Sequence, residues 1–170
     1  VDLGIDNVNF NPPQLRVNLN YDYGKVGTQD FNTFGWINIS GVFDGSNQLL
    51  SLYLNGELIG TTNTSANEII LNINDFHNTI GAGWSDSNQE TTNYFNGKLS
   101  SLAFWDIAIT ESEINENILN QSINNEQNLI VDYRFNASLG TTLFDYSGNQ
   151  NHGTIYGATW VENVYGCTDS

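Results

Sequence analysis

Hydrophobic and polar positions alternate along much of the chain, and this two-residue period predicts strands of a sheet with one buried face. The clearest stretch runs from Phe34 to Gly60. Within it, every second residue from Leu50 to Leu54 is leucine, and residues 36–42 are rich in aromatic and β-branched side chains. Such side chains favour a pleated, half-buried surface. We therefore expect two central strands here.

Turn signals divide the chain into short strands. Asp44-Gly45 and Asn55-Gly56 are dipeptides that tolerate the left-handed backbone of tight hairpin turns. The alternation and the enrichment in apolar residues predict further strands at residues 15–19, 68–73, 79–83, 98–106, 129–135 and 153–161. Polar stretches with turn-forming residues predict a hairpin or loop at 21–33 and a surface loop at 84–93.

One segment has helical periodicity instead. Thr110 followed by Glu113 is a capping-box signature, and Ile114, Ile118 and Leu119 then recur at helical spacing. They predict one short helix over about 110–122. Many short strands, frequent turns and one short helix together predict an all-β fold, an antiparallel β-sandwich or jelly roll.

The charge of the chain restricts its partners. The 170 residues have the length of one ordinary domain and carry a formal charge of −15, with four Lys and Arg residues. Such a surface repels phosphate, so we expect neither nucleic acid nor an anionic membrane as a partner. No apolar run approaches the roughly 20 residues that span a bilayer, so no membrane insertion is expected. Bound cations would relieve the repulsion between carboxylates, although solubility in a salty medium explains the same charge.

Three spaced motifs carry a family resemblance. They read W-I-N-I-S-G-V-F-D-G through L-Y-L-N-G-E-L-I-G at 36–60, I-G-A-G at 80–83, and Y-F-N-G-K-L-S-S-L-A-F-W-D-I-A-I-T-E-S-E-I at 94–114. In this order they resemble the laminin-G-like domains of the concanavalin A-like lectin/glucanase superfamily, and most of all the bacterial type related to pentraxins. With the tail that follows, the resemblance covers about residues 34–163.

The tail of the chain extends this resemblance. The stretches N-L-I-V-D-Y-R-F-N and F-D-Y-S-G-N-Q-N-H-G-T-I-Y-G-A-T-W are similar to segments that accompany such domains in large secreted bacterial proteins. The ending Y-G-C-T-D-S, with the single cysteine Cys167, resembles the start of a short Cys- and Asp-rich repeat. The resemblance implies a laminin-G-like domain over 1–163, a linker at 164–170 into a following module, and a secreted or cell-surface location.

The N-terminal part is short for this resemblance. Such domains carry a strand pair well before the W-I-N-I-S segment, and 35 residues precede Trp36 here. We expect the first strands to be shortened or missing. If they are missing, the sandwich exposes an unpaired edge that a second chain could complete.

The resemblance implies a non-catalytic, lectin-like module that binds a glycan or polysaccharide and is stabilised by Ca²⁺. The alternative is a structural or adhesion spacer with a protein partner and no sugar site. Glucanases of the superfamily carry an E-x-D-x-x-E strand, because one carboxylate attacks while another donates a proton. The chain lacks this spacing, and Glu111 and Glu113 are explained by the dipole of the helix start. No enzyme is therefore expected.

One loop has the composition of a calcium site. Asp145, Ser147, Asn149 and Asn151 recur at alternate positions around Gly148. Alternate oxygen donors around a tight loop are how a chain wraps Ca²⁺, which takes 6–8 oxygen ligands. A polar turn, whose Asp and Asn side chains bond their own backbone, explains the same pattern. Both interpretations stay open at this point.

A second loop has the composition of a sugar site. Sugar recognition needs an aromatic face for C–H stacking and amide or carboxylate oxygens for the hydroxyls. The predicted loop after residue 83 supplies both, in Trp84, Asp86, Asn88, Glu90 and Tyr94. Packing of Trp84 against the core, with the polar residues in solvent, is the alternative. If the chain binds a glycan, these five residues are the predicted ligand site.

Overall fold

The computed structural model describes residues 2–6, 14–19, 22–28, 35–65, 78–85, 88–120, 123 and 127–161. The predicted strand at 68–73 lies outside these ranges. In chain order, the elements are β1 (Asp2–Asp6), β2 (Gln14–Leu19), β3 (Asp22–Thr28), β4 (Ile39–Asp44), β5 (Leu49–Leu54), β6 (Glu57–Asn63), β7 (Gly83–Ser85), β8 (Glu90–Thr92), β9 (Leu102–Trp105), α1 (Glu111–Asn120), β10 (Leu129–Tyr133), β11 (Thr142–Leu143) and β12 (Gly153–Thr154).

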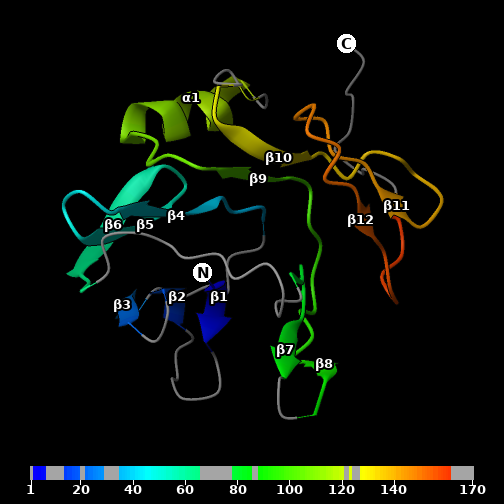
Figure 1. The fold of residues 1–170 in the computed structure, drawn as a ribbon, viewed down its shortest axis with the longest axis horizontal. Helices are drawn as coiled ribbons and strands as arrows, with labels where there is room; N and C mark the ends of the chain where they lie inside the picture. The colour runs from blue at the N-terminus through cyan, green and yellow to red at the C-terminus, as the bar shows by residue number, and fades with distance from the viewer. Residues whose placement is uncertain are drawn as a thin grey trace. The chain divides into compact units, whose positions relative to one another are not determined.

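Over the described residues, the fold is built from antiparallel sheets and one short helix (Figure 1), which confirms the predicted all-β class. The chain divides into two compact units. The first comprises Val1–Ile70 and Trp105–Asn128, and the second comprises Leu71–Phe104 and Leu129–Ser170. Among the described residues, no helix has the length and apolar character needed to cross a bilayer.

The first unit holds two three-stranded sheets, β1-β2-β3 and β4-β5-β6. Strands β2 and β3 contact β5, and β3 also contacts β6. Leu50 and Leu52, at the centre of β5, are almost completely buried, and Ile114 of α1 is buried as well. The predicted leucine alternation therefore marks the core strand. Of the apolar positions that predict the helix, Ile114 is buried, whereas Leu119 is 80% exposed.

Helix α1 begins where its capping signature predicts. Glu113 Oε2 accepts hydrogen bonds from the backbone N (2.7 Å) and Oγ1 (2.9 Å) of Thr110, and Thr110 Oγ1 accepts one from Glu113 N (3.3 Å). This reciprocal arrangement satisfies donors that the first helical turn leaves unpaired. Glu113 therefore has a structural role at this helix end.

The turn between β5 and β6 is the two-residue hairpin that Asn55-Gly56 predicts. Both residues have positive φ, 51° at Asn55 and 83° at Gly56, and Leu54 pairs with Glu57. Asn115 of α1 covers this turn, because its Nδ2 donates to Gly56 O at 3.2 Å. A Cβ atom on Gly56 would lie only 1.9 Å from Asn115 Oδ1. The left-handed backbone therefore favours glycine here, and a Cβ atom would also force the Asn115 side chain to move.

Alanine at three glycines should separate these two requirements. Gly56→Ala is expected to lower the free energy of unfolding by about 2–4 kcal/mol, because it adds a clash to a left-handed backbone. Gly140→Ala, which has φ of 85° but open space around the Cβ position, should lower it by about 1–2 kcal/mol. Gly35→Ala introduces neither a clash nor a left-handed backbone, so it should leave the free energy of unfolding nearly unchanged. Urea denaturation measures all three.

A double variant tests the origin of the Gly56 effect. In an Asn115→Ala background the clash is absent, so Gly56→Ala should then lower stability only as much as Gly140→Ala does. An undiminished loss in that background would contradict the assignment of the clash to Asn115.

The second unit contains three two-stranded pairs, β7-β8, β10-β9 and β11-β12. An isolated bridge between Tyr133 and Asp145 connects β10 to the loop that follows β11. The backbone N of Tyr146 also donates to Asp132 O at 2.8 Å. The segment 129–161 is therefore held together by β10.

Several sequence predictions are corrected by these elements. Residues 22–28 form strand β3, where a hairpin or loop was expected. The register shifts between Gln14 and Leu15, which pair with Thr28 and Val26, so that Gly27 stands in a bulge. The expected loop at 84–93 is largely the hairpin β7-β8. Leu99 and Phe104, two apolar residues of the predicted strand at 98–106, are exposed.

Candidate functional site

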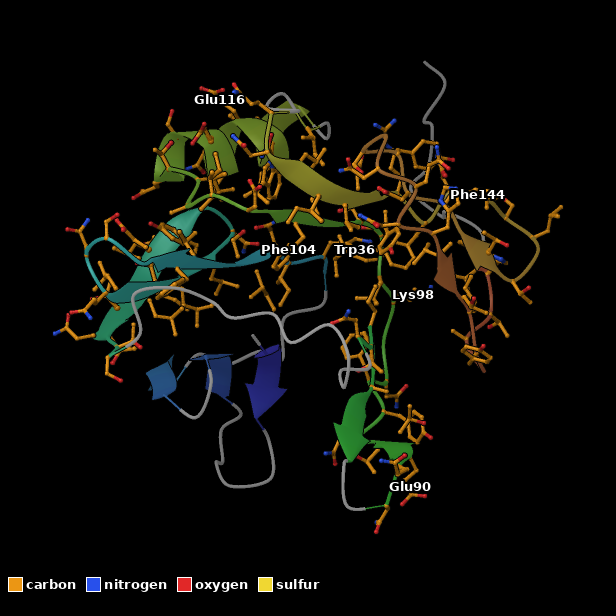
Figure 2. The ribbon with its side chains drawn as sticks, viewed as in Figure 1. Trp36, Glu90, Lys98, Phe104, Glu116 and Phe144 are labelled. Atoms are coloured by element: carbon orange, nitrogen blue, oxygen red, sulfur yellow. The ribbon has the colours of Figure 1, made fainter. Side chains whose placement is uncertain are left out.

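The predicted sugar loop is a hairpin in the structure. Gly83, Trp84 and Ser85 pair with Thr92, Thr91 and Glu90. Figure 2 shows Glu90 at this hairpin. The side chain of Trp84 and the whole of Asp86 lie outside the described residues, so the predictions for these two residues are not tested.

The remaining predicted residues gather on strand β8 and its flanks. Asn88 Nδ2 donates to Glu90 Oε1 at 3.2 Å. The Tyr94 hydroxyl lies 2.8 Å from Thr91 Oγ1 and donates to Thr91 O at 3.1 Å, while 73% of the tyrosine remains exposed. The hydroxyl end of the ring is thus fixed and its body is left to solvent. The hairpin presents an anchored aromatic ring at Tyr94 and a hydrogen-bonded amide and carboxylate at Asn88 and Glu90.

The backbone below this ring is also fixed. Phe95 N donates to Gly81 O at 2.8 Å, and Thr79 Oγ1 donates to Ala82 O at 2.6 Å. The first bond ties the residue after Tyr94 to the segment before β7, and the second, from a side-chain hydroxyl, closes the turn that leads into β7. The bond between Phe95 and Gly81 therefore fixes the backbone next to the aromatic ring.

The predicted calcium loop brings its four residues together. The carboxylate of Asp145 is buried and accepts four hydrogen bonds. Oδ1 accepts from the backbone N of Asp132 and of Ser147, both at 2.9 Å. Oδ2 accepts from Ser147 Oγ at 2.8 Å and from Asn151 N at 2.9 Å. Two donors at each oxygen leave the carboxylate fully hydrogen-bonded.

The two asparagines of this loop bind the backbone of β10. Asn149 Nδ2 donates to Leu129 O (2.7 Å) and lies 3.1 Å from Ile130 O. Asn151 Nδ2 donates to Ile130 O at 2.9 Å. The Tyr133 hydroxyl in turn donates to Asn151 O. We call Asp145, Ser147, Asn149 and Asn151, with these backbone partners, the polar latch.

The latch changes the acidity of its central carboxyl. Burial raises the pKa of Asp145, but the hydrogen bonds from Asp132, Ser147 and Asn151 to the charged form outweigh it. The pKa of Asp145 is therefore held below its ordinary value. The latch is built around an ionised aspartate.

This geometry matches the polar-turn interpretation of the loop. A Ca²⁺ ion bound by the Asp145 oxygens would displace donors that now occupy their lone pairs, and both asparagines direct Nδ2 to carbonyl oxygens. The residues as arranged here do not fit a calcium ligand set. In the described part of the chain, no group of three or more His, Cys, Asp or Glu residues could hold a metal ion. Calcium binding at this loop stays a prediction.

Sequence reasoning missed residues around the latch on β10 and outside it. Asp132 of β10 is buried and forms an ion pair with Arg134, whose Nη2 lies 2.8 Å from Asp132 Oδ2. His152 Nδ1 accepts a hydrogen bond from Asp145 N at 3.1 Å. An aspartate inside the apolar strand L-I-V-D-Y was the available signal, because unpaired aspartate is almost never fully buried.

Comparison with known proteins places this fold. A laminin-G model described as the concanavalin A-like lectin/glucanases superfamily matches residues 3–115. Among solved structures, a Bacteroides ovatus protein provisionally described as a carbohydrate binding protein aligns with a TM-score of 0.66 and 22% identity, over 83% of this chain and 39% of its own. An S-layer domain-containing protein from Clostridium thermocellum aligns with a TM-score of 0.39 and 20% identity, over 62% and 51%.

These matches differ in what they establish. No protein with a curated description matches the chain. At 22% identity the Bacteroides ovatus structure shows the fold alone, and this chain spans 39% of its length. The family model covers well over half of the 170 residues. The chain therefore belongs to the concanavalin A-like lectin/glucanases superfamily.

Proposed function

We propose that this chain is a non-catalytic carbohydrate-binding module of a larger secreted protein. The observation that carries the proposal is the exposed Tyr94 ring, anchored by its hydroxyl to Thr91 on the hairpin β7-β8, which also carries the hydrogen-bonded Asn88–Glu90 pair. Membership in a superfamily of lectins and glucanases supports it, as does the fold shared with a protein provisionally described as carbohydrate-binding.

The chemistry of the hairpin suits a sugar ring. The face of an aromatic ring is electron-rich and attracts the polarised C–H groups on the apolar face of a pyranose. Glu90 accepts hydrogen bonds from sugar hydroxyls, and Asn88 both donates and accepts them. Tyr94 loses little freedom on binding because its hydroxyl is already held by Thr91. Trp84 and Asp86 belong to the same proposed site.

The non-catalytic part of the proposal rests on the carboxylates. Glu113 is engaged in the helix cap, and Asp145 accepts four hydrogen bonds in the polar latch. A retaining glycosidase instead needs two carboxyls about 5 Å apart that are free to attack and to donate a proton. The chain also lacks the E-x-D-x-x-E spacing.

Binding to neutral hexasaccharides tests the site. The probes are β-1,3-glucan, β-1,4-glucan, β-1,4-mannan and β-1,4-xylan, measured by isothermal titration calorimetry. For whichever probe binds, Tyr94→Ala should weaken the affinity at least tenfold, because it removes the stacking face. Tyr94→Phe keeps the face and should retain most of the affinity. Tyr156→Ala removes a tyrosine that is 87% exposed elsewhere and is the matched control.

The outcomes distinguish the proposed function from the proposed position of the glycan site. Binding that is unaffected by Tyr94→Ala would move the glycan site away from the hairpin. Absence of binding to every probe would contradict the proposed function itself.

A further inference from the structure

A second aromatic surface lies in the segment 129–161, beyond the residues that the family model matches. Side chains of this segment surround a shallow, open depression of the surface. Its lining includes Phe135, Asn136, Leu143, Phe144, Tyr146 and Trp160. We call it the aromatic depression. Figure 2 labels Phe144, which follows β11.

The local sequence builds this surface by alternation. Leu143 and Asp145 are buried, whereas Phe144 and Tyr146 are each 46% exposed. Two large aromatic side chains therefore point away from the small core of this segment. Core packing alone does not explain why two such residues are left half in solvent.

Contacts outside the depression hold two of its rings in place. The Phe144 ring packs edge-to-face on His152, with ring centres 5.6 Å apart. The indole Nε1 of Trp160 donates to Gly140 O at 2.8 Å, which fixes the indole plane. Rings held in this way lose little conformational freedom when a ligand arrives.

The remaining aromatic residue on the β10 side sits on a strained backbone. Phe135 has φ of 45°, a left-handed conformation that is an outlier for a bulky residue. This turn brings its ring edge-to-face with Tyr133, 6.5 Å between centres. Strain of this kind persists where the surrounding structure enforces it, and it concentrates at binding sites.

Polar groups are placed at the edge of the depression. The Tyr146 hydroxyl donates to Asn136 Oδ1 at 3.2 Å, which orients the amide and leaves its Nδ2 hydrogens for a ligand. The Arg134 guanidinium lies 4.8 Å from the centre of the Tyr146 ring and is paired with Asp132. Aromatic faces with a few oriented polar groups are typical of small-molecule sites.

The size and charge of the depression select its occupant. The depression is too shallow to enclose a ligand, unlike a site of roughly 300–1,000 Å³ that encloses a drug-sized molecule, so a ligand would lie across its exposed rings. The lining is also far smaller than the roughly 20–30 residues that each partner contributes to a stable protein interface. The charge of Arg134 is neutralised by Asp132 in a chain of net charge −15, so an anionic ligand is disfavoured.

We propose that the aromatic depression binds one ring of a neutral polysaccharide, as a second subsite separate from the hairpin. This inference rests on the proposed carbohydrate-binding function. The sugar ring would stack on Phe144 or Trp160 and receive a hydrogen bond from Asn136 Nδ2. The rest of the polysaccharide would continue into solvent from the shallow opening.

The indole N–H signal of Trp160 reports on this subsite directly. We expect a saturable shift of that signal in ¹H–¹⁵N spectra on titration with a neutral hexasaccharide from the panel above, and no shift with hexagalacturonate. The signal is assigned with Trp160→Phe. Phe144→Ala should weaken the affinity measured at this signal at least tenfold, whereas Tyr156→Ala, in the same segment, should not change it. The dispersed spectrum of each variant verifies that it is folded.

Each outcome decides between the two sites. One outcome is binding that shifts hairpin signals, is lost in Tyr94→Ala and leaves the Trp160 signal unshifted. It would overturn the proposal for the aromatic depression and leave the proposal for the hairpin standing. A Trp160 shift that survives Tyr94→Ala and weakens in Phe144→Ala supports it. A Trp160 shift that is equally strong with hexagalacturonate would overturn the selectivity for a neutral ring. If no probe shifts any signal, both proposals fail.

Discussion

Replacing Asp145 with alanine is expected to lower the free energy of unfolding by about 3–5 kcal/mol. The substitution removes an acceptor of four hydrogen bonds, and it leaves the backbone donor of Asp132 unpaired in a buried place and those of Ser147 and Asn151 in partly buried ones. Each buried donor without a partner costs about 1–3 kcal/mol. Such a loss is at the upper end for a single substitution. Urea denaturation at neutral pH measures it.

Asp44 offers a matched control. Its carboxylate accepts two hydrogen bonds from Asn47, at Oδ1 from the backbone (3.1 Å) and at Oδ2 from Nδ2 (2.7 Å), but in an exposed turn. Asp44→Ala should leave the denaturation midpoint nearly unchanged, because water replaces the lost acceptor. Equal effects at Asp44 and Asp145 would contradict the structural role of the polar latch.

The acidity of Asp145 gives this prediction a pH dependence. Its pKa is lowered in the folded state from 3.8, so the ionised latch contributes stability above about pH 4. That contribution is lost as the pH falls through the lowered pKa. The difference in stability between wild type and Asp145→Ala should therefore shrink as the pH is taken below 4. A difference that grows on acidification would contradict the sign of the shift.

The same two proteins test the calcium prediction. Thermal melts are recorded in excess Ca²⁺ and again with a chelator. Binding to the native state alone adds about 2.7 kcal/mol at 100 times the dissociation constant. An upward shift of the midpoint with Ca²⁺ that disappears in Asp145→Ala would assign the ion to this loop. Equal midpoints with Ca²⁺ and with the chelator would indicate that hydrogen bonds alone hold this loop.

Replacing Leu52 with alanine is expected to lower the free energy of unfolding by about 2–5 kcal/mol. Leu52 has no exposed surface and lies at the centre of β5, between β4 and β6. The loss combines the transfer of the removed side chain with the cavity it leaves. Leu58→Ala, on β6 with 43% exposure, is the control and should lower stability by less than about 1 kcal/mol. Similar losses at both positions would contradict the position of the core.

Local signals explain which parts of the fold the sequence predicts. The start of α1 is determined by Thr110 and Glu113, three residues apart, and both lie where the capping box requires. The Asn55-Gly56 turn likewise follows from two neighbouring residues and their backbone preferences. Each of these structures is set by residues close together in the sequence, so no knowledge of tertiary contacts is needed.

Pairing with distant strands explains where prediction fails. Strand β3 contains Gly24 and Gly27, which look like turn residues until β2 pairs with the strand and leaves Gly27 in a bulge. Strands β7 and β8 are three residues each, too short for an apolar alternation. Their assignment depends on pairing with each other, which composition does not reveal.

The candidate sites show the same division. Alternate polar residues identify the loop at 145–151, but its function in the structure depends on carbonyl oxygens of β10, about twenty residues earlier. The aromatic depression joins Phe135, Phe144 and Trp160 from separate parts of the segment. No short motif contains all three. Residue types alone therefore identify candidate site residues, but they do not give the geometry in which those residues are arranged.

A glycan array probed with the wild-type chain in calcium-containing buffer tests the central claim most directly. The proposed function predicts saturable binding to at least one class of neutral polysaccharide, weakened by Tyr94→Ala and unaffected by Tyr156→Ala. No binding to any glycan on the array, by a protein that melts cooperatively, would contradict a carbohydrate-binding module and favour a spacer domain with a protein partner.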